Sequence, residues 1–338
     1  TLILLLTCTF ATAQMTYIHC GKIVDTKNGK VLENKTLIVE GDKITAVENG
    51  FKQGDAEDTT IIDLKNKTVL PGLIDMHVHI EGQSNPKAYL QRFTQNEADV
   101  AFQSTVFARN TLMAGFTTVR DLGGSGVNIA LRNAITKGHV DGPRIYTCGK
   151  ALGTTGGHAD PTNGMKKELM GNPGPKEGVV NSVEDARQAV RQRYKNGADV
   201  IKITATGGVL SMAKSGQNPQ FTEEEVNAIC ETAKDYGRHV AAHAHGDEGM
   251  HIAIRGGVKT IEHGTLMSEE TMELMKEYDA YYVPTITAGK EVSEKAKISG
   301  YYPDIIVPKA LEIGPKIMGT FEKARKKGVS IAFGTDAG

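Results

Sequence analysis

Two histidines separated by one residue are the first feature of this sequence that could do chemistry. His77 and His79 end an apolar run that starts at Leu73. Side chains two residues apart on a strand point to the same side, so the two imidazoles would face one point in space. Imidazole nitrogens are common ligands of transition metals. Two packed or surface histidines would give the same pattern, so the pair predicts a metal site only together with other ligands.

Further donor side chains stand at the ends of other apolar segments. They are Lys202, His243, His245, His263 and Asp336. Each of them alone fits a core or turn residue as well as a ligand. Together they would bring nitrogen and carboxylate donors to the ends of several strands, and this coincidence predicts a metal centre.

Lys202 is the unusual member of this set, because it stands in an otherwise apolar strand. Its neighbours Ile201 and Ile203 should pack outward against helices, which turns the lysine inward. An isolated buried ammonium is costly, so it needs a partner or altered chemistry. Reaction with carbon dioxide would convert the amine to a carbamate anion, which can bridge two cations. The alternative is a lysine that extends to the strand end and reaches solvent.

The elements that must position these residues alternate between apolar strands and amphipathic helices from Thr68 onward. Strands are predicted at 73–77, 119–121, 144–148, 199–204, 239–243, 258–263, 281–285 and 330–336. Helices are predicted at 97–114, 182–197, 222–237, 268–278 and 309–328. Such alternation is typical of a parallel sheet, and eight strands predict a closed (β/α)8 TIM barrel with its site at the carboxyl ends of the strands. Long loops are expected to recognise the substrate, at 153–179, 207–220 and 288–308.

A small β region precedes the barrel. Short alternating segments predict strands at 17–25, 35–40, 43–47 and 60–64. Asn28-Gly29 and Gly41-Asp42 fit hairpin turns between the first three of them. At the other end the chain stops two residues after Asp336. We therefore expect a barrel that is truncated after its eighth strand.

Residues 1–13 have the character of a partial signal peptide. Leu2 to Leu6 form a short apolar run, and Ala11-Thr12-Ala13 before Gln14 fits a cleavage site. The run is shorter than the ~20 residues that a spanning helix needs. We therefore expect an exported protein, periplasmic or secreted, with no membrane span. An apolar N-terminal strand is the alternative.

Composition narrows the class of protein further. The chain has 39 Lys+Arg and 40 Asp+Glu, a net charge of −1, which argues against a generally basic nucleic-acid binder. With 39% hydrophobic and 23% charged residues it should form a globular core. Cys20, Cys148 and Cys230 lack metal-knuckle spacing and are expected to be small buried hydrophobes. A homo-oligomer is compatible with this composition.

The segment from Pro71 to His79 resembles the amidohydrolase superfamily, together with Lys202, His243, His263 and Gly334-Thr335-Asp336. The segments 240–246 and 118–121 are similar to its imidazolonepropionase-like branch, which includes Xaa-Pro dipeptidases (prolidases). This resemblance implies an α/β fold, a (β/α)8 barrel with a small N-terminal β-sandwich domain. The expected domains are a sandwich part at 14–68 and a metal-dependent barrel at 69–338.

The resemblance also implies two divalent metal ions, usually zinc. His77, His79 and Asp336 would hold the more buried ion. His243 and His263 would hold the second, and carboxylated Lys202 would bridge the two.

A hydroxide shared by the two ions would attack the scissile carbonyl. Asp336 would be the catalytic residue, taking the proton of the nucleophile and delivering it to the leaving amine. His158 and His245 are candidates for binding the substrate carboxylate or the developing oxyanion. Arg120, next to Asp121, is expected to form a structural ion pair rather than to clamp the substrate.

The leading hypothesis is a binuclear hydrolase of dipeptides, with Xaa-Pro dipeptides as its sharpest form, or of N-acyl amino acids. The alternative is a mononuclear cyclic-amide hydrolase or deaminase of the imidazolonepropionase type. Lys202 separates the two, because a carbamate bridge has no purpose with one metal. A third hypothesis, a non-catalytic scaffold on the same fold, predicts lost ligands, whereas all six are present.

Overall fold

A computed structural model describes residues 14–54 and 59–338 of the chain. The predicted signal peptide at 1–13 lies outside the described residues. The chain divides into two compact units, the first ending at Leu73 and the second running from Ile74 to Gly338. None of the described helices is both long and apolar enough to cross a membrane.

The first unit contains one four-stranded sheet. Its strands are β1 (Met15–Asp25), β2 (Lys30–Glu40), β3 (Lys43–Asn49) and β4 (Thr60–Val69), in the order β3-β2-β1-β4. The β1–β2 and β2–β3 pairs are antiparallel, as expected for hairpins, and β1–β4 is parallel. Cys20, Ile23 and Leu37 form its small apolar core. The second layer of a sandwich remains a prediction, since the described residues of this unit form a single sheet.

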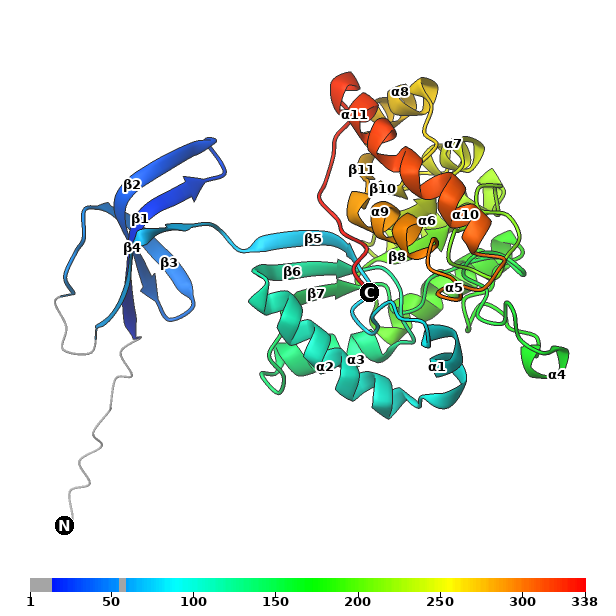
Figure 1. The fold of residues 1–338 in the computed structure, drawn as a ribbon, viewed down its shortest axis with the longest axis horizontal. Coiled ribbons are helices and arrows are strands. Elements are labelled where there is room, and N and C mark those ends of the chain that lie inside the picture. Colours follow the sequence, from blue (N-terminus) through cyan, green and yellow to red (C-terminus); the bar gives the residue numbers. More distant parts are fainter. Residues whose placement is uncertain (1–13, 55–58) are drawn as a thin grey trace, which may run out of the picture. The chain divides into compact units, whose positions relative to one another are not determined.

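The second unit contains seven strands in two sheets. They are β5 (Leu73–Val78), β6 (Phe116–Asp121), β7 (Arg144–Thr147), β8 (Ile201–Thr204), β9 (Val240–Ala244), β10 (Thr260–His263) and β11 (Tyr281–Val283). They form the sheets β5-β6-β7 and β8-β9-β10-β11, and Figure 1 shows β5, β6 and β7 side by side. The registers β6–β7, β8–β9, β9–β10 and β10–β11 are parallel. This arrangement is the parallel α/β architecture that the alternating pattern predicts.

Isolated contacts close the two sheets into a ring. Leu152 bridges to Ile203 of β8, which joins the β7 side to the second sheet. The predicted eighth strand at 330–336 is not a regular strand, and this expectation was wrong. The segment makes only two isolated bridges, which link Tyr282 to Ile331 and Val78 to Ala337. These bridges nevertheless join β11 back to β5, so the TIM-barrel-like α/β fold is confirmed.

Helices cover the outside of this ring. The longer ones are α2 (Glu97–Met113), α3 (Val127–Thr136), α5 (Val183–Asn196), α6 (Glu223–Asp235), α7 (Asp247–Arg255), α8 (Glu269–Glu277), α9 (Ile286–Lys295) and α11 (Ile317–Lys327). The shorter ones are α1 (Ala88–Thr94), α4 (Lys167–Met170), α10 (Val307–Ile313) and the 3-10 turn η1 (Gly314–Lys316). Thr222 opens α6 with a capping box, and Ser182 caps α5. The largest apolar core lies between β8–β11 and α5–α8.

Two expectations about this shell were wrong. The predicted loop at 288–308 contains α9, and the predicted helix at 309–328 is divided into α10, η1 and α11. Gly289 and Gly314 explain both. A Cβ on Gly314 would lie 2.6 Å from the Gly289 carbonyl oxygen, and one on Gly289 would lie 2.9 Å from Ile317. These glycines permit close packing of α9 on η1, whereas glycine in a sequence favours a loop prediction.

Candidate active site

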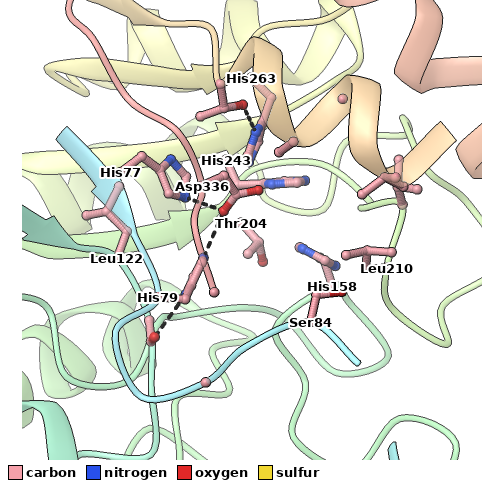
Figure 2. Close-up of a pocket in the computed structure, with 18 of the residues that line it drawn as sticks. His77, His79, Ser84, Leu122, His158, Thr204, Leu210, His243, His263 and Asp336 are labelled. Atoms are coloured by element: carbon pink, nitrogen blue, oxygen red, sulfur yellow. Dashed lines mark hydrogen bonds and ion pairs between the residues drawn. The ribbon is translucent and has the colours of Figure 1, made fainter. Parts of the chain in front are cut away.

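One cavity in the second unit brings together every predicted site residue (Figure 2). Its volume is about 550 Å³. The predicted residues that line it are His77, His79, His158, Lys202, His243, His245, His263 and Asp336. They come from β8, from the carboxyl ends of β5, β9 and β10, from the loop before α4 and from the segment at 330–336. Convergence at this end of the strands is what a barrel site requires.

Asp336 lies between His77, in β5, and His79, which directly follows β5. Its Oδ1 is 3.2 Å from His77 Nε2 and 3.3 Å from His79 Nε2. His79 Nδ1 donates to the Gly123 carbonyl oxygen at 2.9 Å, and His77 Nδ1 donates to Glu262 at 2.9 Å. When Nδ1 carries the proton in a neutral imidazole, Nε2 keeps a free lone pair. In this tautomer both Nε2 atoms can bind a metal ion.

A cation fits this position. One donor atom each of His77, His263 and Asp336 lie within 4.8 Å of one another. His77 Nε2 is buried and has no hydrogen-bond partner. A buried polar atom without a partner is costly, and a metal ion would satisfy it. The donor set of imidazole and carboxylate suits zinc and similar divalent cations.

Glu262 accepts the hydrogen bond from His77 Nδ1, and this residue was not identified from the sequence. Its other oxygen accepts from Arg120 Nη2 at 2.6 Å, and both side chains are buried. Burial raises the pKa of Glu262, but Arg120 and the hydrogen bond from His77 lower it to about 2. Arg120 thus forms the expected structural ion pair, with a partner 142 positions away in the chain. A charged residue inside the apolar strand 258–263 was the signal available for Glu262, as it was for Lys202.

The second group of histidines lies across the cavity. The ring centroids of His243 and His263 are 4.7 Å apart. His263 Nδ1 is hydrogen-bonded to Thr285 Oγ1 at 2.7 Å, and His243 Nε2 donates to the Gly207 carbonyl oxygen at 3.1 Å. Burial, followed by neighbouring positive groups for His243, keeps the pKa of both imidazoles well below the ordinary range. They are therefore neutral and each presents one free nitrogen.

The backbone is strained at three residues of the site. His263, Thr285 and Asp336 have φ values of 69°, 48° and 60°. Non-glycine residues avoid this left-handed region, and a β-branched threonine does so most strongly. Such strain costs about 1–3 kcal/mol for each residue and clusters at functional sites. With this backbone conformation the Asp336 carboxylate lies 3.2 Å from His77 Nε2.

Lys202 lines the cavity with its side chain buried. Burial lowers the pKa of its amine, although Glu262 and Asp336 oppose the shift. Within the ranges 14–54 and 59–338 no carboxylate lies within 4.0 Å of its nitrogen. A lowered pKa raises the fraction of free amine, the form that reacts with carbon dioxide. Carboxylation itself stays a prediction.

His158 and His245 lie beside the second histidine group. The His158 ring centroid is 4.3 Å from that of His243, and His158 Nδ1 is buried without a hydrogen-bond partner. His245 Nδ1 lies 2.9 Å from Thr265 Oγ1, and with the hydroxyl group as donor the ring keeps its N–H on Nε2. Burial lowers the pKa of His158 to about 3 and that of His245 to about 4. Both are neutral imidazoles that can donate one hydrogen bond into the cavity.

Large apolar side chains line another part of the cavity, and none of them was singled out from the sequence. They are Tyr89, Val209, Leu210, Val292, Tyr302, Ile313 and Ile317. Figure 2 shows Leu210 next to His158, across the cavity from His77. The cavity thus combines a histidine-rich part with an apolar part, as substrate pockets commonly do.

Comparisons with known proteins agree with this geometry. The sequence profile of the Amidohydrolase family matches residues 68–338. A crystal structure of a Xaa-Pro dipeptidase with methionine bound in its active site is 52% identical, with a TM-score of 0.91, covering 96% of this chain and 79% of that one. A prolidase complexed with N-methylphosphonate-L-proline is 34% identical, with a TM-score of 0.85, covering 96% and 78%. Ochratoxinase from Aspergillus niger is 33% identical over 345 residues, 96% of this chain and 69% of that enzyme.

Proposed function

We propose that this chain, which belongs to the amidohydrolase family, cleaves the amide bond of dipeptides, with Xaa-Pro dipeptides as the first class to test. The observation that carries the proposal is the position of Asp336 Oδ1, 3.2 Å from His77 Nε2 and 3.3 Å from His79 Nε2. A carboxylate so placed can share a cation with both rings. It can also exchange a proton with a substrate nitrogen at the same point.

Two divalent cations, zinc in the first instance, form part of the proposal. His77, His79 and Asp336 would hold one ion, His243 and His263 the other, and carboxylated Lys202 both. When bound, such ions polarise a carbonyl group and make water nucleophilic near neutral pH.

Asp336 is proposed as the proton carrier of the reaction. Burial raises the pKa of its carboxyl group, but His77, His79 and His263 lower it well below its ordinary value. It is therefore ionised at neutral pH and can accept a proton at Oδ1. It would then return the proton to the leaving amine nitrogen. Proton transfer by a positioned side chain typically contributes ~10²–10⁴-fold to the rate.

His158 and His245 are proposed to hold the substrate. Each is neutral, and His158 Nδ1 has no partner within the protein. An N–H donated by either ring would suit a substrate carboxylate or the oxygen of the scissile carbonyl. The bound methionine and proline analogue of the two similar enzymes support a substrate with an amino-acid product.

A one-metal hydrolase of a cyclic amide is the second candidate. One observation favours it: among the described residues, the group of three close donor atoms is a single one, formed by His77, His263 and Asp336. In a one-metal enzyme Lys202 would remain a free amine. The state of Lys202 therefore distinguishes the two candidates.

The test is a hydrolysis assay of the purified chain loaded with zinc, manganese or cobalt. The panel contains Xaa-Pro dipeptides, other dipeptides, N-acyl amino acids and cyclic amides, and amino-acid release is followed by mass spectrometry. We expect dipeptides to be cleaved, and Asp336→Asn to lose at least about 10²-fold in kcat. Cleavage of cyclic amides alone would overturn the proposal, and so would an Asp336→Asn variant as active as the wild type.

A further inference from the structure

We infer that Lys309 is a positioning residue that fixes one wall of the cavity and thereby determines the enzyme's preference for a large apolar substrate side chain. This inference rests on the proposed function, because it assigns a substrate class to the same cavity. Lys309 belongs to α10 and does not line the cavity itself. It would act through the loop that follows β8.

Lys309 is buried, and its ammonium group is fully used by this one loop. Nζ donates to the carbonyl oxygens of Gly208 at 3.1 Å, Ser211 at 2.6 Å and Ala213 at 2.7 Å. An ammonium group has three donors, so three carbonyl oxygens satisfy it. Across residues 14–54 and 59–338, no carboxylate comes within 4.0 Å of Nζ. The bonds to the loop are thus what compensates the burial of this charge.

The loop at 207–213 is the part of the chain that these bonds hold. The Gly207 carbonyl oxygen accepts from His243 Nε2 at 3.1 Å. The Leu210 carbonyl oxygen accepts from the Tyr89 hydroxyl group at 2.8 Å. The loop therefore contacts His243, a predicted metal ligand, at one end and the Tyr89 side chain of α1 further along. Lys309 holds the loop at Gly208, between these two anchors, and at Ser211 and Ala213, which follow them.

This loop supplies the apolar wall. Val209 packs in one cluster with Tyr302 and Ile313, and all three line the cavity. Leu210 also lines it, next to His158 (Figure 2). The positions of Val209 and Leu210 depend on the hydrogen bonds that hold this loop in place. Because three bonds come from Lys309, this lysine should decide how well a large apolar group is accepted.

The test compares Lys309→Met with the wild type on two dipeptides, Leu-Pro and Gly-Pro. Methionine keeps an apolar stem of similar length and removes the donors. We expect kcat/KM for Leu-Pro to fall about ten-fold or more through KM, as loss of a charge-assisted hydrogen bond predicts. For Gly-Pro, whose first residue has no side chain to contact the wall, we expect a change of less than about three-fold. Lys316→Met, at an exposed lysine of η1, is the matched control and should match the wild type on both substrates.

Hydrogen exchange of the metal-loaded protein without substrate gives a second readout. We expect faster exchange at residues 207–213 in Lys309→Met, with unchanged exchange in β8–β11. Unchanged loop exchange together with unchanged discrimination between Leu-Pro and Gly-Pro would overturn the inference. So would an equal loss on both dipeptides. If Lys309→Met does not fold, Lys309→Arg keeps the charge and is expected to shift the discrimination in the same direction. A wild type that cleaves no dipeptide would refute the proposed function, while the exchange result would still test the role of Lys309 in holding the loop.

Discussion

His77 Nδ1 lies 2.9 Å from Glu262 Oε2, and both side chains are fully buried. Arg120 holds the other oxygen of Glu262 at 2.6 Å. Glu262 and Arg120 therefore fix the orientation of the His77 ring through its Nδ1, and its Nε2 points toward Asp336. Such outer partners of metal-binding histidines fix the ring and its tautomer.

Replacing Glu262 by Gln should weaken metal binding. An amide can place its NH2 group toward His77 and cannot carry the charge that Arg120 requires. We expect metal affinity to fall by about 10–100-fold, measured by competition with a chromogenic chelator. The unpaired buried Arg120 should also lower the free energy of unfolding in urea, by about 3–5 kcal/mol. Glu277→Gln, at an exposed position of α8, is the control. Equal metal affinity in Glu262→Gln and the control would refute this role.

Removal of metal should abolish hydrolysis and loosen the fold. Dialysis against a chelator is expected to remove activity, and added zinc to restore it. A ligand that binds only the folded state at about a thousand times its Kd stabilises by about 4 kcal/mol, so the melting temperature should fall on chelation. Thermal unfolding with and without chelator measures this. Full activity after exhaustive chelation, with no metal detected, would contradict metal dependence.

Much of the fold follows from the sequence, and the comparisons confirm the resemblance to the prolidase-like branch of the amidohydrolases. Strand alternation with capped helices was sufficient, because each strand and its helix are local in sequence. The segment at 330–336 differs in two respects: Asp336 has a positive φ of 60°, and a Cβ on Gly334 would lie 2.5 Å from Val283. That constraint, and the turn at Asp336, arise from contacts between distant segments. Periodicity does not report such contacts.

The candidate site, too, could be predicted from the sequence only in part. His77, Lys202 and Asp336 could be singled out because their types are unusual at strand ends. Glu262 and Lys309 could not be placed in the same way. Their partners, His77 and the loop at 207–213, lie 185 and about 100 positions away and meet them only in the folded chain. Roles that depend on contacts between such distant residues can be assigned only from the structure.

Gly208 should not tolerate a side chain. A Cβ at this position would lie 2.2 Å from His158 Cε1. We expect Gly208→Ala to displace the His158 ring and to cost about 1–3 kcal/mol of stability through overpacking. If His158 binds substrate, KM should rise as well. Gly174→Ala, in the segment that follows α4 and with nothing within 4 Å of its Cβ position, is the control. A Gly208→Ala variant with wild-type stability and KM would contradict the packing of His158.

Asp121 should make stability depend on pH. Its carboxylate is buried and accepts from Thr147 and Asn128. Burial, the largest effect, raises its pKa from 3.8 to about 6. The folded state then binds the proton more tightly than the unfolded state. The resulting stabilisation is complete below pH 3.8 and is lost as the pH rises through about 6.

The comparison that isolates Asp121 uses Asp121→Asn, which does not titrate. From pH 5 to 7, the stability of the wild type relative to this variant should fall by about 1 kcal/mol. Urea unfolding of both proteins at several pH values measures the difference. Parallel curves would mean that Asp121 ionises in the folded protein as it does in the unfolded chain.

The metal content of the purified protein, measured by mass spectrometry beside the dipeptide activity of Lys202→Ala, tests the account most directly. We predict two divalent ions per chain in the wild type, and fewer ions with little hydrolysis in the variant. One ion per chain, with Lys202→Ala as active as the wild type, would contradict a two-metal amide hydrolase bridged by this lysine.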